Sequence, residues 1–137
     1  MKRIKYFAIV AFVMILGIKA TYAQDPSFIV DWNPCNLQIT GSEYHIQYAI
    51  YNTTTNTFVV PATWYGTTFP HTDLYGTVEV NSWDCNQMDT KPYLYIYVYV
   101  ELRKDGVTYC TGSARSSLLT CDEMYNNTTT ITVNMIQ

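Results

Sequence analysis

Residues 93–102 carry the pattern that most restricts the fold of this chain, Tyr-Leu-Tyr-Ile-Tyr-Val-Tyr-Val-Glu-Leu. Strict alternation places two kinds of side chain on opposite faces of a β-strand. The even positions from Leu94 to Leu102 are all aliphatic, so they are expected to face a core. A strand this apolar is prone to aggregate at a sheet edge. We therefore expect it in the centre of a sheet, paired on both sides.

The rest of the chain repeats this period-two pattern in shorter segments, and no segment after residue 23 has helical periodicity. Turn signals such as Asp105-Gly106 and Asn126-Asn127 separate the segments. About seven to nine short strands with frequent turns predict one antiparallel β-sandwich, immunoglobulin-like or C2-like, over residues 24–137. The expected strands are 27–32, 36–40, 44–51, 57–60, 77–81, 93–102, 107–112, 116–121 and 131–135.

Two registers compete in the hairpin that follows the long strand. A two-residue turn at Asp105-Gly106 pairs Leu102 with Tyr109 and Glu101 with Cys110. A three-residue loop, with Gly106 in the left-handed position, instead pairs Arg103 with Val107 and Val100 with Cys110. We favour the three-residue loop because it places Cys110 on the aliphatic face, and a one-residue slip would reverse every side chain.

Residues 1–23 have the pattern of a secretory signal peptide. Three basic residues precede an apolar run over 6–18, and Ala-Thr-Tyr-Ala ends the segment at Ala23. The run is shorter than the ~20 residues of a membrane-spanning helix. We expect cleavage after Ala23, a secreted or periplasmic protein, and no membrane insertion afterwards.

Charge limits the partners of the mature chain. The whole chain has 8 basic and 11 acidic residues. The expected signal removes four basic residues (Lys2, Arg3, Lys5, Lys19) and no acidic one, which leaves a net charge of −7. Nucleic acid and other polyanions are therefore disfavoured. Neutral glycans, proteins and cations stay open as partners.

Four cysteines remain in the mature chain: Cys35, Cys85, Cys110 and Cys121. An even count in a small exported chain predicts two disulfides, and four cysteines allow three pairings. Zinc is disfavoured because the spacing lacks a C-x-x-C pair. The similar segments Trp-Asn-Pro-Cys-Asn at 32–36 and Trp-Asp-Cys-Asn at 83–86 lead us to favour Cys35–Cys85 and Cys110–Cys121.

The tyrosine face of residues 93–102 is the first candidate binding site. Tyr93, Tyr95, Tyr97 and Tyr99, with Tyr109 beside them, would form an aromatic platform if exposed. Such a platform stacks on sugar rings or anchors a protein interface. The alternative, which we favour, is that this face packs beneath a second sheet or a long loop. A second aromatic cluster is expected at Trp64, Tyr65 and Phe69.

Candidates for metal binding and catalysis are weaker. Asp84, Asn86 and Asp89, with Asp31 and Asn33 in the similar loop, supply the oxygen ligands that calcium prefers. Plain turn residues explain the same pattern, and we favour that interpretation. His71 and Asp73 resemble a base and its orienting acid, but no nucleophile accompanies them.

These observations favour a non-catalytic exported binding module for a neutral glycan or a protein. No cofactor is expected, except calcium if the acidic cluster binds it. The alternative from a different class is a structural subunit that self-associates through strand edges or the tyrosine face. A small secreted hydrolase has the least support.

Overall fold

The computed structural model describes residues 25–81, 83–85, 88, 92–126 and 128–137. The expected signal segment, residues 1–23, lies outside them. One helical segment, α2, accompanies the strands in this part of the chain. The elements in chain order are β1 (Ser27–Asn33), β2 (Glu43–Asn52), β3 (Thr57–Trp64), β4 (Phe69–Pro70), β5 (Tyr75–Glu79), β6 (Tyr93–Lys104), β7 (Val107–Arg115), β8 (Leu119–Thr120), α2 (Cys121–Tyr125) and β9 (Thr130–Asn134).

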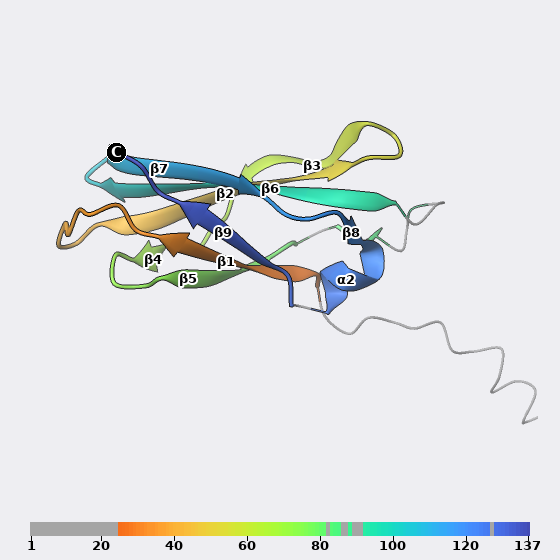
Figure 1. Ribbon diagram of the computed structural model, residues 1–137, viewed down its shortest axis with the longest axis horizontal. Helices are drawn as coiled ribbons and strands as arrows, with labels where there is room; N and C mark the ends of the chain where they lie inside the picture. Colours follow the sequence, from red (N-terminus) through yellow and green to blue (C-terminus); the bar gives the residue numbers. More distant parts are fainter. Residues whose placement is uncertain (1–24, 82, 86–87, 89–91, 127) are drawn as a thin grey trace, which may run out of the picture.

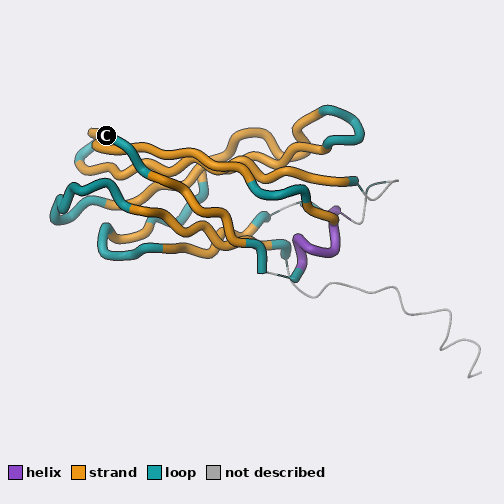
Figure 2. The backbone as a smooth tube through the Cα atoms, viewed as in Figure 1, coloured by secondary structure: helices purple, strands orange, loops and turns teal. Residues whose placement is uncertain are grey.

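The strands form two packed sheets, which confirms the expected β-sandwich (Figures 1 and 2). The larger sheet has the order β3-β2-β6-β7, with β4 beside β2 and β8 beside β6. The smaller sheet has the order β5-β1-β9. The long tyrosine-bearing strand β6 is central and paired on both sides, as its apolar pattern predicted.

The strand pairing is that of an immunoglobulin-type sandwich in which the C-terminal strand takes the place of the first. β1, β2, β3, β5, β6 and β7 pair as the B, C, C′, E, F and G strands of that fold do. β9 lies on the other side of β1, in the position of strand A, and runs parallel to β1. This pair departs from the purely antiparallel arrangement expected, because the chain reaches this position from β8 and α2.

The core lies between the sheets and is made by one face of each strand. All five aliphatic residues of β6 from Leu94 to Leu102 are buried, with the alternate residues from Tyr44 to Ile50 on β2. Phe28 of β1 contacts Tyr48 edge-on, and Trp32 packs against Tyr44 with ring centroids 4.7 Å apart. The inward faces predicted from period-two alternation are therefore confirmed.

Two expected strands are wrong. Residues 36–40 form a loop, because the Cys35–Cys110 disulfide holds its start and Leu37 N–H bonds back to the Cys35 carbonyl (2.6 Å). Residues 116–121 contain only the short β8 before α2 begins.

A capping box starts helix α2, which the sequence analysis missed. The Thr120 side chain accepts a hydrogen bond from the Glu123 N–H, and the Glu123 carboxylate accepts one from the Thr120 N–H (2.7 Å). The latter hydrogen bond lowers the pKa of the Glu123 carboxyl. The spacing of Thr120 and Glu123 was the available sequence signal for this helix.

The β6–β7 hairpin combines features of both expected registers. Asp105 and Gly106 have φ of 51° and 78°, so a two-residue turn pairs Lys104 with Val107. The favoured three-residue loop is therefore wrong.

The three-residue loop was favoured because it turns Cys110 towards the aliphatic face. A β-bulge two residues beyond the turn has the same effect. Arg103 pairs with Thr108 and Leu102 with Cys110, so Tyr109 is the extra residue of β7. Cys110 is buried on the aliphatic face, but opposite Leu102 rather than Val100.

The disulfides are Cys35–Cys110 and Cys85–Cys121, so the presence of two bridges is confirmed and their expected pairing is wrong. Cys35 follows the end of β1 and Cys85 follows the end of β5. Since β1 and β5 are antiparallel, these two cysteines lie at opposite ends of the sandwich. Each instead pairs with the cysteine at its own end.

Candidate functional site: an aromatic trench

The tyrosine face of β6 is the outer face of the larger sheet. The smaller sheet packs only against the aliphatic side, so the packing that the sequence analysis favoured for the tyrosines is wrong. Tyr93 and Tyr97 are 54% and 38% exposed, while Tyr95 and Tyr99 are half-buried among neighbours on the same face.

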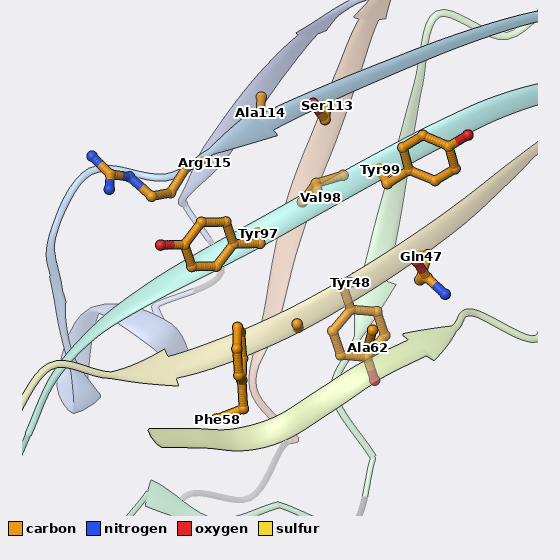
Figure 3. Close-up of a pocket in the computed structure, with 11 residues that line it drawn as sticks. Gln47, Tyr48, Phe58, Ala62, Tyr97, Val98, Tyr99, Ser113, Ala114 and Arg115 are labelled. Carbon is orange, nitrogen blue, oxygen red and sulfur yellow. The ribbon is translucent and has the colours of Figure 1, made fainter. Parts of the chain in front are cut away.

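A trench of about 620 Å³ lies on this face and is lined by residues of β3, β2, β6 and β7. The rings of Tyr97 and Tyr99 lean apart along β6, which opens the space between them (Figure 3). Ala49 of β2, Ala62 of β3 and Ser113 of β7 line it with small side chains. The trench exists because small residues on three strands meet the gap between two tyrosines on the fourth.

Phe58 and Tyr97 form one wall of the trench. Their ring centroids are 6.1 Å apart, and Tyr51 contacts both rings edge-on, at 5.1 and 6.4 Å. Tyr95 continues this cluster, with the Arg115 guanidinium carbon 4.2 Å from its ring centroid. These contacts fix the rings of the wall before any ligand arrives, which lowers the entropic cost of binding.

Tyr99 forms the opposite wall with Gln47, and Trp64 packs behind Tyr99 at 6.2 Å. The Tyr99 hydroxyl donates a hydrogen bond to the Glu101 carboxylate (3.0 Å). Burial, with the hydrogen bond and charge of Glu101, raises the pKa of Tyr99. The hydroxyl therefore stays protonated at neutral pH, so this wall presents a neutral ring.

The lining is mostly apolar, with polar atoms at a few places. Gln47 and Ser113 supply an amide and a hydroxyl, and the tyrosine rings carry hydroxyls at their tips. Among the lining residues the only formal charge is on Arg115. Aromatic walls with a few polar groups are typical of sites that bind neutral amphipathic molecules, and the volume is within the ~300–1,000 Å³ usual for such sites.

The structure places four of the five expected platform residues on one face. Tyr97 and Tyr99 line the trench, Tyr95 supports it, and Tyr93 lies beyond it at the start of β6. Tyr109 is not brought to the others: it is the bulge residue beside Leu102 and Arg103, at the other end of the face.

Phe58 and Trp64 belong to the site, although the sequence analysis did not place them there. The pairing of β2 with β3 sets Phe58 opposite Tyr51 and Trp64 opposite Gln47, on the outer face. This pairing contains two irregularities, so the register between β2 and β3 could not be predicted from the alternation of side chains alone. Of the second expected cluster, Tyr65 and Phe69 stack at 6.4 Å as a separate pair.

The expected calcium ligands are not brought together where they are described. Asp84 accepts a hydrogen bond from the Tyr125 hydroxyl (2.6 Å), and Asn33 donates one to Asn134 (2.7 Å). Asp84 follows β5 while Asp31 and Asn33 lie in β1, near opposite ends of the sandwich. Asn86 and Asp89 lie outside the described residues. Within the described ranges no group of three His, Cys, Asp or Glu residues is close enough to hold a metal ion.

His71 and Asp73 lie in the turn between β4 and β5. Their backbones hold that turn in place: His71 N–H donates to the Ser42 carbonyl (3.1 Å), and the Asp73 carbonyl accepts from the Trp32 indole (2.9 Å). These contacts give His71 and Asp73 a structural role in a packed turn.

Comparisons of the chain with protein-family models, with curated proteins and with solved structures find no match. None of the helices in the described part of the chain is long and apolar enough to cross a membrane. The two disulfides fit an oxidising compartment, extracellular or periplasmic.

Proposed function

We propose that this protein is an exported, non-catalytic binding module whose aromatic trench binds a neutral glycan. The observation that carries the proposal is the open trench between the Tyr97 and Tyr99 rings on an exposed sheet face. Sugar rings present apolar C–H faces and equatorial hydroxyls. Aromatic walls match the former, and the polar atoms of Gln47 and Ser113 match the latter.

Charge supports a neutral ligand over an anionic one. The net charge of −7 without residues 1–23 repels polyanions at long range. Arg115 is the single cation in the lining, and its guanidinium is already stacked on Tyr95. A cationic ligand would meet no carboxylate among the lining residues, since Glu101 lies behind Tyr99 and bonds its hydroxyl.

Export is the second part of the proposal. Its support is the apolar run over 6–18 and the small residue at Ala23, together with the two disulfides. We expect the exported protein to begin at Gln24, because Ala23 ends the segment that a signal peptidase recognises. Intact-mass measurement of protein recovered outside the inner membrane checks this. A membrane-bound species that keeps residues 1–23 would contradict it.

Glycan binding is tested by affinity electrophoresis through gels containing mixed-linkage β-glucan, xylan, galactomannan or pullulan. We expect at least one of them to retard the protein. Tyr97→Ala should weaken that binding at least tenfold, because truncating an aromatic anchor typically costs 2 kcal/mol or more. It should lower the free energy of unfolding by only about 1 kcal/mol, since Tyr97 is partly exposed.

Tyr93→Ala is the matched control for this substitution. Tyr93 lies on the same strand and face, is more exposed, and does not line the trench. Its truncation should leave both binding and stability almost unchanged. Equal loss of binding in the two variants, or no retardation by any of the four polymers, would contradict the proposed site.

A self-assembling structural subunit is the second candidate function. The specific observation that favours it is β5, which pairs with β1 alone among the described strands and exposes Tyr75 on its outer face. An unpaired strand edge is a template for pairing with another chain. Sedimentation velocity over a hundredfold range of concentration separates the candidates: a glycan-binding module stays monomeric, whereas an assembling subunit shifts to larger species.

A further inference from the structure

We propose that the trench binds an internal stretch of a polysaccharide chain rather than a chain end. This inference rests on the proposed function and adds the mode of recognition. Its basis is that the lining residues come from all four main strands of the larger sheet, including both outer ones, β3 and β7. The trench therefore runs from one edge of the sheet to the other.

At the β3 side the trench leads past Ala62, whose side chain is small and exposed. Pro61 and two register shifts against β2 bend this edge strand. The described lining residues on that side are Phe58, which belongs to a wall, and the small Ala62, so neither of them closes the trench. A chain that enters here can continue beyond the sheet.

At the β7 side the trench leads past Ser113, again small and exposed, with Ala114 beside it. Among the described strands none pairs with β7 beyond this edge of the sheet, apart from the single bridge of Thr111 to Ile136 nearer the hairpin. Recognition of a chain end requires a wall that stops the chain and polar groups that bind its terminal hydroxyls. Neither side of this trench has such a wall among its lining residues.

Two polar side chains of the trench lie along its sides, and the hydroxyl of Ser113 lies at its β7 end. Gln47 stands on the Tyr99 wall and Arg115 on the Tyr97 wall, so both reach a chain from the side (Figure 3). Four strands span three inter-strand spacings, which gives the trench a length of about 14 Å. Affinity should therefore rise with the length of an oligosaccharide until it exceeds this span, and then stay constant.

The decisive experiment counts protein molecules on one polymer chain. Mixed-linkage β-glucan, xylan, galactomannan and pullulan, each of narrow size distribution, are titrated with the protein and followed by sedimentation velocity. Internal binding predicts many protein molecules on each chain of the polymer that binds, in proportion to chain length. Saturation at one or two protein molecules whatever the length indicates end recognition and overturns the inference, while the proposed function stands.

Oligosaccharide ladders from the same four polymers give an independent test by calorimetry. Blocking either terminus, by reduction at one end or methylation at the other, should change the affinity of the longest oligomers by less than twofold. A tenfold loss on blocking one terminus would overturn the inference. Binding of no polymer and no ladder would instead refute the proposed function itself, so the two failures are distinguishable.

A pair of leucine substitutions on β7 locates the binding in the trench. Ser113→Leu places a bulky side chain in the trench and should weaken polymer binding at least tenfold. Thr108→Leu is the control, because Thr108 is also exposed on β7 but pairs with Arg103, away from the trench. Equal affinity of both variants and the unaltered protein for the bound polymer would overturn the assignment of internal binding to this trench.

Discussion

Replacing Cys35 and Cys110 together by serine should lower the free energy of unfolding by about 4 kcal/mol. The bridge joins residues 75 apart in sequence, so its loss releases a large closed loop in the unfolded chain. For a domain of this size the melting temperature should fall by more than about 10 °C. The bridge also holds the loop over 34–42 against β7, so this loop should become more susceptible to proteolysis.

The second disulfide provides the comparison for this result. Cys85 and Cys121 are 36 residues apart and close a shorter loop. Their joint replacement by serine should therefore lower the free energy of unfolding slightly less than loss of the longer bridge does. Urea denaturation of both double variants, with thiols counted in the unfolded protein, measures the difference. A loss below about 1 kcal/mol for the Cys35–Cys110 variant would contradict the role given to this bridge.

The largest effect of a single added methyl group is expected at Gly112. Gly112 lies on β7 where the two sheets approach each other, and a Cβ atom there would be 2.5 Å from the Asn134 carbonyl oxygen and 2.7 Å from Val133. Because one of these neighbours is backbone, β9 would have to move away. We expect Gly112→Ala to lower the free energy of unfolding by about 1–3 kcal/mol or more, because the added methyl group overpacks this contact.

Gly66→Ala is the control for Gly112. Gly66 has no atom within 4 Å of an added Cβ and lies in the loop after β3, so alanine there should leave stability within about 0.5 kcal/mol of the unaltered protein. Thermal unfolding of the two variants gives the difference directly. Equal melting temperatures would show that β7 and β9 are not in close contact at this point.

These substitutions also separate stability from binding. Neither cysteine pair lines the trench, and Gly112 faces the core. At temperatures where they remain folded, the variants should therefore bind glycan as the unaltered protein does. Tyr97→Ala should have the opposite profile, with binding lost and most of the stability kept.

Alternation alone determined much of the architecture. The period-two pattern of residues 93–102 predicted a central strand and the face that it buries, because an aliphatic side chain exposed at every second position would be too costly. The same pattern in residues 44–51, 77–81 and 131–135 predicted the buried faces of β2, β5 and β9. The count of cysteines predicted two bridges, although it said nothing about which cysteines are close.

Contacts between distant segments were decided only by the tertiary structure. The disulfide pairing depends on which strand ends meet, and the antiparallel pairing of β1 with β5 places Cys35 and Cys85 at opposite ends. The facing of Cys110 depends on a bulge at Tyr109, which local turn chemistry does not reveal. The parallel position of β9 depends on the path of the chain through α2.

The candidate site also combines features that the sequence predicted with features that only the tertiary structure decided. The tyrosine repeat is visible in the sequence, but its exposure depends on where the second sheet packs, and tyrosine is stable in either environment. Phe58, Trp64 and the small residues Ala49, Ala62 and Ser113 lie far from Tyr97 in sequence. They meet there only because the registers of three strand pairs, two of them irregular, bring them to one face. A sequence pattern determines which side of a strand a residue occupies, whereas a trench requires the register between strands, which the packing of the whole sheet sets.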